Sequence, residues 1–343
     1  MKKVYFVLAI TLFAFVFASC TKEGAFKPKE RISKVFRSST WSWTYNPAVY
    51  ESGSDQTSKY LREMWKWGDK TLDQIDYYSS NGTVSYSYNF TYDNKKRIER
   101  IDDYKDSYYT TFKYDGKVLK TVETWSNGTI YASANITYEG NAFSGRKIKK
   151  IDYTEYDKKK NAKEEYLSNP LRFLLGEEIA NNVDVALNKR NATRGVFLVT
   201  IDFTWTKNNV STMKISGNDG GYFEHTYTYT YDSNKNPFYK MYAMLGPDED
   251  AVDCLSENNV TGYTYTYIED GDTDNGTVNY NLSYDGKYPS MKMYTDTYSY
   301  SDVYHEYVGY HWDENLGQYV DEYNDTPYTY TSTSTYTTYY EYE

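Results

Sequence analysis

One short pattern recurs along the chain and limits the folds open to it. It reads aromatic or aliphatic residue, then Thr, Lys or Ser, then aromatic residue, usually Asp or Glu, and then a turn rich in Gly, Asn and Lys. Copies lie at 90–96, 112–118, 136–142, 203–209, 229–238 and 282–288. Between Tyr86 and Tyr92 aromatic side chains alternate with Ser, Asn and Thr, a period of two that is typical of a strand. Each copy therefore predicts one β-hairpin.

The turns and the aliphatic spacing predict how these hairpins join. Asp-Gly or Asp-Asn ends several copies, and Asn81-Gly82, Asn127-Gly128 and Asn275-Gly276 predict the turns between copies, because Asn and Gly accept positive φ. Two isoleucine pairs, at 98 and 101 and at 148 and 151, are three residues apart rather than two, which predicts a recurrent bulge. We expect an all-β fold, an antiparallel meander of about 16–18 strands. It forms a rolled sheet or a barrel.

One stretch departs from the strand pattern. Residues 169–190 carry Leu, Ile, Val and Ala at helical spacing, and Asn169-Pro170 suits the start of a helix. The sequence predicts one short helix near 170–188 that packs against a sheet face or plugs a barrel end. A recognition helix for a partner is the weaker alternative.

Composition restricts the function. The net charge of −10 and the scattered basic residues argue against nucleic-acid binding, which needs a basic patch. Aliphatic residues are few, but 44 Tyr and 7 Trp supply side chains that bury large areas and favour strands.

The N-terminus predicts export. Lys2 and Lys3 precede an apolar run to Phe17, and Ala18-Ser19 precede Cys20, as in a secretory signal. Phe17-Ala18-Ser19-Cys20 resembles a bacterial lipobox, which implies a signal peptide at 1–19 and a lipidated Cys20. An ordinary cleaved signal is the alternative. We expect a tether at 20–36 and a single β-meander domain at 37–343 with the helical insertion at 169–190. Cys254 is then the remaining cysteine, expected as a small buried residue.

The lipobox followed by Tyr-Asp-turn-Lys hairpins resembles Bacteroides-type lipoproteins that carry a domain of unknown function described as having a porin-like fold. This resemblance implies a rolled or closed β-meander and no activity. Thr21-Lys22-Glu23-Gly24 partly resembles the stretch after the lipidated cysteine of surface-exported lipoproteins. We therefore expect an outer-membrane, lipid-anchored protein at the cell surface, with the periplasmic face as the alternative.

Few residues suggest chemistry. Asp270, Asp272 and Asp274 have the alternate spacing of a calcium loop, but Asn275 stands where that loop needs Gly, and its twelfth position lacks Glu. We interpret the stretch as an acidic hairpin tip around Asn275-Gly276 and expect neither a metal nor a cofactor.

The aromatic residues give the main functional indication. Rows of tyrosine can fill a partly hydrated interior, or they can stack on sugar rings and bind extended peptides. For the second role the candidate platform is Trp65, Trp67, Trp125 and Trp312. We expect a non-catalytic protein that binds a glycan, a peptide or an envelope partner. A structural or adhesion component of the envelope is the alternative, and a hydrolase is less favoured because no nucleophile–base set is visible.

Overall fold

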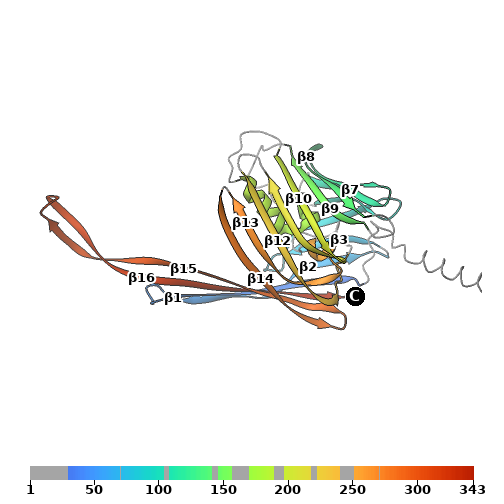
Figure 1. The fold of residues 1–343 in the computed structure, drawn as a ribbon. Coiled ribbons are helices and arrows are strands. Elements are labelled where there is room, and N and C mark those ends of the chain that lie inside the picture. The colour runs from blue at the N-terminus through green and yellow to red at the C-terminus, as the bar shows by residue number, and fades with distance from the viewer. Residues whose placement is uncertain are drawn as a thin grey trace, which may run out of the picture.

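The computed structural model describes residues 30–69, 71–103, 108–140, 146–156, 170–188, 197–217, 222–239, 251–269 and 271–343. Its strands form one closed antiparallel barrel in which each strand pairs with its neighbours in sequence and β16 closes on β1. The strands are β1 (Ile32–Asn46), β2 (Gly53–Trp67), β3 (Leu72–Tyr78), β4 (Val84–Tyr92), β5 (Ile98–Asp103), β6 (Tyr108–Asp115), β7 (Val118–Ser126), β8 (Thr129–Glu139), β9 (Lys147–Glu155), β10 (Phe197–Thr206), β11 (Asn209–Gly217), β12 (Phe223–Lys235), β13 (Asn258–Glu269), β14 (Asp272–Asp285), β15 (Tyr288–Asp313) and β16 (Gln318–Tyr342). The predicted all-β meander is thus confirmed as a 16-stranded barrel (Figure 1).

The barrel begins earlier than the sequence indicated. Strand β1 starts at Ile32, whose side chain is 2% exposed, so residues 32–36 of the predicted tether belong to the wall. The polar character of 21–36 concealed the start of the strand, because only Ile32 and Val35 among its first residues are buried in the core. Residues 1–29, with Cys20 and the predicted signal peptide, lie outside the described residues.

The predicted bulges are present and recur around one end of the barrel. Tyr92 pairs with Ile98 and Thr91 with Arg100, so Glu99 is an extra residue in β5, and Lys149 is its counterpart in β9. Each bulge lets two aliphatic residues three apart face the interior, as Ile98 and Ile101 do at 2% exposure each.

An aromatic collar at this end explains why the repeat places Tyr or Trp before its turn. The ring nitrogen or hydroxyl of each of these side chains donates to a backbone carbonyl at the bulge of the preceding hairpin, as when Tyr138 Oη bonds the Leu119 oxygen at 2.7 Å. Tyr284 is the exception, because its hydroxyl bonds Asp232. The other bonds run from Trp67 to Ile32, Tyr92 to Leu72, Tyr114 to Ile98, Trp205 to Ile148, Tyr231 to Val210 and Tyr342 to Pro289. The collar therefore ties every second strand to the neighbouring hairpin.

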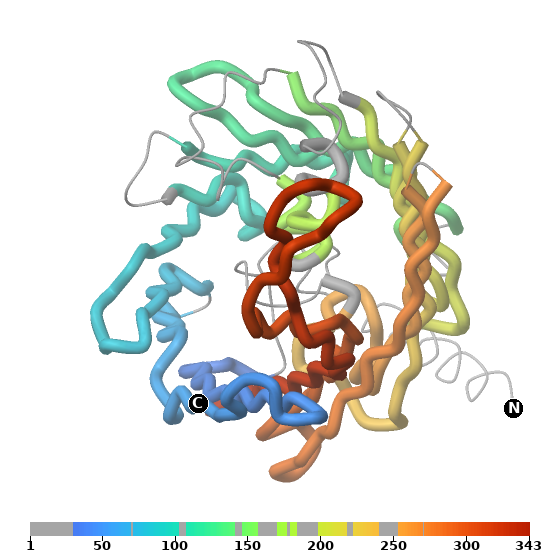
Figure 2. Tube along the Cα trace, turned by 90° about the vertical axis from the view of Figure 1, so that its left-hand side faces the viewer, coloured from blue at the N-terminus to red at the C-terminus, as the bar shows by residue number. Residues whose placement is uncertain are grey.

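The interior is occupied by helix α2 (Leu171–Asn188), at the position predicted (Figure 2). Phe173 packs against Tyr88 of β4, with ring centroids 5.6 Å apart. Asn182 donates to the hydroxyl of Tyr227 on the opposite wall at 3.0 Å. Gly176 takes a φ of 80° at a kink in the helix. The short helix α3 (Ala251–Leu255) carries Cys254, which is fully buried as expected.

One predicted turn is wrong. Asn275 and Gly276 lie inside β14, paired with Thr266 and Tyr265 of β13, and the chain reverses near Gly271 instead, where φ is 98°. A Cβ on Gly276 would lie 2.2 Å from the Tyr265 ring. Glycine is therefore needed at this position to make room for a tyrosine across the sheet rather than to form a turn.

Candidate functional site: the aromatic arm

The most distinctive feature of the molecule is a β-ribbon that leaves the barrel (Figure 1). Strand β15 pairs with β14 only as far as Tyr294, whereas its pairing with β16 continues to Asp313. Strands β1 and β2 accompany this ribbon for part of its length, up to the pair Asn46–Thr329. We call residues 40–57 and 295–335 the arm, and residues 303–327, where only β15 and β16 pair, its tip. At about 3.3 Å per residue, 295–313 reach roughly 60 Å.

The arm exposes large aromatic side chains that the barrel would bury. Tyr310 is 65% exposed and Tyr319 is 66% exposed, with ring centroids 5.2 Å apart. Trp41 and Trp43 lie side by side nearer the barrel, 4.4 Å between centroids. The other exposed large side chains of the arm are Tyr50, Tyr298, Tyr300, Val303, Tyr307, Val308, Trp312, Leu316 and Tyr323. Such a concentration on one projecting element is typical of an interaction surface.

A tyrosine cluster stiffens the arm where the β1–β2 hairpin ends. The ring of Tyr45 lies 5.0 Å from that of Tyr330 and 5.1 Å from that of Tyr50. A hydrogen bond with Tyr300 and burial together raise the pKa of Tyr328 to about 12. The packed rings and this hydrogen bond join β1, β15 and β16 at this point of the arm.

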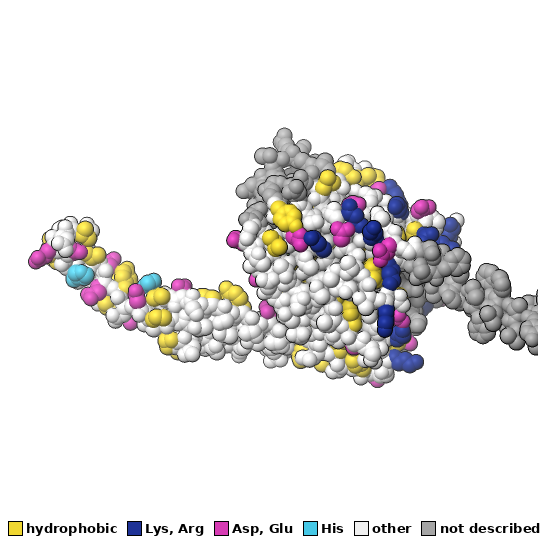
Figure 3. Space-filling model, in the orientation of Figure 1, with side chains coloured by type: hydrophobic (Ala, Val, Ile, Leu, Met, Phe, Trp, Pro, Cys, Tyr) yellow, Lys and Arg dark blue, Asp and Glu magenta, His cyan; other side chains and the backbone are white. Residues whose placement is uncertain are grey.

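The arm is also acidic. Residues 295–335 contain no Lys or Arg. They carry Asp296, Asp302, Glu306, Asp313, Glu314, Asp321, Glu322 and Asp325. In contrast, hairpin turns at the collar end hold Lys95, Lys96, Lys117, Lys207 and Lys287. The up-and-down topology brings these lysines, scattered in sequence, to one end of the barrel. Figure 3 shows acidic and hydrophobic side chains along the arm and basic ones on the barrel.

The four tryptophans of the predicted platform do not form one surface. Trp65 is buried inside the barrel and donates to Glu63 at 2.8 Å, and Trp67 belongs to the collar. Trp125 lies on the outer wall, stacked on Tyr109 with centroids 5.9 Å apart. Trp312 alone lies on the arm, 52% exposed. Trp65 and Trp67 are neighbours, with ring centroids 6.2 Å apart, but Trp125 and Trp312 lie elsewhere, so the four residues do not share one surface.

The acidic stretch predicted as a hairpin tip gives no metal centre in the described residues. Asp272 and Asp274 lie in β14, paired with Glu269 and Tyr267 in a regular ladder. Asp270 lies outside the described residues. Among the residues that the structure describes, no three His, Cys, Asp or Glu side chains gather closely enough to hold a metal ion.

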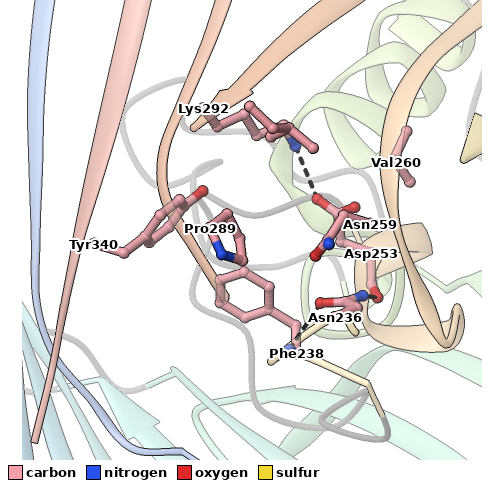
Figure 4. A pocket seen from close by; sticks show the side chains of 9 residues that line it. Asn236, Phe238, Asp253, Asn259, Val260, Pro289, Lys292 and Tyr340 are labelled. Carbon is pink, nitrogen blue, oxygen red and sulfur yellow. Dashed lines mark hydrogen bonds and ion pairs between the residues drawn. The ribbon is translucent and has the colours of Figure 1, made fainter. Parts of the chain in front are cut away.

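A small pocket inside the barrel has its polar groups already engaged (Figure 4). Lys292 Nζ lies 2.8 Å from Asp253 Oδ2. Asn236 accepts a bond from the Phe238 amide at 2.8 Å and donates to the Ser256 carbonyl at 3.0 Å. These contacts hold α3 and the neighbouring loop against the wall, and we interpret the pocket as structural.

The outer face of the barrel is polar. Lys150 lies 2.7 Å from Asp152, and Lys214 lies 2.7 Å from Glu224. Hydrogen bonds from Lys214 and Tyr222 lower the pKa of Glu224 below its ordinary value. Separately, none of the helices in the described part of the chain is long and apolar enough to cross a membrane.

Comparison with known proteins gives similar solved structures, among them two of proteins described as porin-like. One, from Bacteroides uniformis, is 12% identical, with 91% of this chain and 98% of that chain covered and a TM-score of 0.39. The other, from Bacteroides vulgatus, is 11% identical, with 78% and 92% covered and a TM-score of 0.39. No family model matches the chain, and neither does any curated protein. Similarity at this level assigns no function.

Proposed function

We propose that this protein is a non-catalytic, lipid-anchored component of a bacterial envelope that binds a partner through the arm. The arm carries the proposal, because it projects beyond the wall with exposed aromatic side chains such as Tyr310 and Tyr319. The barrel supplies a rigid base, since α2 occupies its interior with Leu174 and Leu175 at 1% and 0% exposure. Because the arm does not contribute side chains to this core, its exposed aromatic residues are best explained as a surface that recognises a partner.

The position of the chain ends supports anchoring with the arm directed outward. Ile32 and Tyr342 pair at the collar end, opposite the arm (Figure 1). Eleven residues lie between Cys20 and Ile32, which allows a reach of at most about 40 Å. A lipid on Cys20 holds the collar end near the membrane, and the arm then points away from it.

The chemistry of the wall favours attachment by lipid over insertion as a pore. A membrane barrel presents an apolar band to lipid, and charged groups at mid-membrane destabilise it by about 2–4 kcal/mol each. Here the outward positions of β9 to β12 include Lys150, Asp152, Lys214 and Glu224. This polar wall supports a barrel that lies in water rather than in the bilayer. We propose that it is attached at the outer membrane and faces the cell exterior, with the periplasmic face as the alternative.

A structural or adhesion role, in which the arm joins protein subunits, is the second candidate. It is favoured by the long unpaired edge of β15 beyond Tyr294, since such edges recruit strands from other chains. We assign no reaction, because the interior carboxylates Glu63 and Glu155 hydrogen-bond to Trp65 and to Tyr131 and Tyr153 respectively.

Anchoring is tested by Cys20→Ala, which we expect to release the protein from the membrane fraction. Cys254→Ala is the control, because that cysteine is buried in α3, and this variant should stay with membranes. Retention of the Cys20 variant would contradict lipidation.

Partner binding is tested by replacing Tyr310 with a photo-crosslinking amino acid, p-benzoylphenylalanine, in cells that make the protein. The same replacement at Tyr222, 48% exposed on the barrel, is the control. We expect a discrete crosslinked species from the arm position and none from the barrel position. Equal crosslinking at both positions, or none at the arm, would contradict the proposal.

A further inference from the structure

The unpaired edge of β15 lacks the proline and lysine residues that often protect sheet edges. Natural edge strands carry Pro, Lys or strong bulges that block pairing with other chains. Residues 295–313 contain no Pro, Lys or Arg and have a single irregularity between Tyr307 and Gly309. The other edges of the arm are protected, since β2 carries Lys59 and the tip of β16 carries Pro327. The edge of β15 is therefore the place where a further strand can add.

The two faces of β15 differ in a way that selects the added strand. On one face Thr295, Thr297, Ser299 and Ser301 make hydroxyl pairs with β16, such as Thr295 with Thr335 at 3.0 Å. Strand alternation places the acidic and aromatic side chains on the opposite face. These are Asp296, Tyr298, Tyr300, Asp302, Tyr304 and Glu306. Every carboxylate before the bulge thus lies on one face, beside tyrosine rings.

Charge decides between a second copy of this chain and a different partner. Two arms side by side would bring acidic residues together without a compensating Lys or Arg, and like charges across strands are destabilising. A strand with Lys or Arg at alternate positions would instead meet Asp296, Asp302 and Glu306, with its cationic stems over the tyrosine rings.

We propose that the arm binds a basic, extended polypeptide segment, which adds as a further strand along residues 295–307 of β15. This inference deepens the proposed function and rests on it. The added strand uses backbone hydrogen bonds for affinity and alternate cationic side chains for selection. It also stabilises the two-stranded tip, because an isolated pair of strands is marginally stable in water.

The test uses the full chain and three labelled ten-residue peptides with blocked ends, followed by fluorescence anisotropy. The peptides alternate Lys with Thr, Glu with Thr, and Lys with Pro. We expect the Lys–Thr peptide to bind roughly ten-fold or more tightly than the other two, because Glu has the wrong charge and Pro cannot pair along an edge. Equal binding of the Lys–Pro peptide would mean attraction by charge without strand addition and would overturn the proposal.

Two further measurements locate the bound peptide. The triple variant Asp296→Asn, Asp302→Asn, Glu306→Gln should weaken Lys–Thr binding roughly ten-fold. The matched variant Asp115→Asn, Asp274→Asn, Asp285→Asn, three exposed acids of the barrel, should leave it unchanged. Amides of 295–307 should exchange more slowly with the peptide bound. Equal loss in both variants, or no protection of β15, would contradict the site.

The outcomes separate this inference from the proposed function. If none of the peptides binds while crosslinks form at Tyr310, the arm has a partner of another class, such as a glycan or a second copy, and the basic-strand inference is wrong. If Tyr310 gives no crosslinks in cells, the proposed function itself fails.

Discussion

The barrel and the arm are built from the same alternation of Tyr with Thr or Ser, yet the side chains have opposite environments. Tyr227 of β12 is fully buried, and its hydroxyl lies 3.2 Å from that of Tyr267. Tyr298 of β15, in a comparable sequence, is 59% exposed. The difference comes from what faces each strand. β12 faces α2 in the barrel interior, whereas in the described part of the chain no second layer covers β15 beyond Tyr294. Tyrosine suits both places because its ring packs and its hydroxyl tolerates water.

The largest expected effect on stability comes from replacing a leucine of the barrel, and a leucine of the arm gives the comparison. Leu175→Ala removes a fully buried side chain of α2, which should lower the free energy of unfolding by about 3 kcal/mol. Leu316→Ala at the tip, where the side chain is 63% exposed, should change it by less than about 0.5 kcal/mol. Denaturant titration measures both. A similar loss in the two variants would mean that the tip is packed against a core.

A buried carboxylate of the barrel should make a smaller, pH-dependent contribution. Burial raises the pKa of Asp76, but hydrogen bonds from Lys66, Ser87 and Gln74 outweigh it, and the pKa falls below 3.8. A carboxyl group whose pKa is lower in the folded state stabilises the fold at any pH above its pKa in the unfolded chain. This stabilisation is lost as the pH falls through the pKa of the folded state.

Asp76→Asn should therefore lower stability by about 2 kcal/mol at neutral pH. The difference from the parent protein should shrink below about pH 4. Asp296→Asn on the exposed arm is the control and should leave thermal unfolding unchanged. A pH-independent loss in the Asp76 variant would show that the charge does not matter there.

The collar should show a smaller effect still. Tyr138→Phe removes the donor to the Leu119 carbonyl, and one lost hydrogen bond of this kind costs about 1 kcal/mol. Tyr298→Phe, at a side chain 59% exposed on the arm, should cost nothing measurable in thermal unfolding. Equal stability of both variants with the parent would mean that the collar does not stabilise the barrel.

The smallest effect is expected from removing the tip. Asp302 pairs with Tyr328, so an Asn-Gly turn can join them in place of residues 303–327. Because β1 pairs only as far as Thr329, the deletion removes the two-stranded part and one exposed ring contact, that of Tyr304 with Tyr50. The free energy of unfolding should change by less than about 0.5 kcal/mol. A loss above about 1 kcal/mol would show that the tip supports the barrel.

Local features were predictable from the sequence, and long-range pairings were not. The hairpins, the helix and the bulge at Ile98 and Ile101 follow from spacing within a few residues. The arm could not be predicted in this way, because β15 and β16 show the same alternation as the strands of the barrel wall. They leave the wall only because the pairing of β15 with β14 ends at Tyr294. The turn expected at Asn275-Gly276 was wrong for a similar reason, since Gly276 leaves space for the ring of Tyr265 on the neighbouring strand.

The candidate site was predictable in residue type but not in position. Aromatic residues indicated binding, yet of the chosen tryptophans only Trp312 lies on the arm. The acidity of 295–335 is visible in the sequence as a run without Lys or Arg. That signal becomes informative only once the segment is known to leave the barrel.

The arm stands free of the barrel, and amide hydrogen exchange on the isolated full chain can measure this. We predict slow exchange in β8, β9 and β10, whose ladders close around α2, and fast exchange throughout 303–327, where two exposed strands have no core. Protection of the tip equal to that of β9 would contradict the account, because the arm would then already be covered by the chain itself or by a second copy.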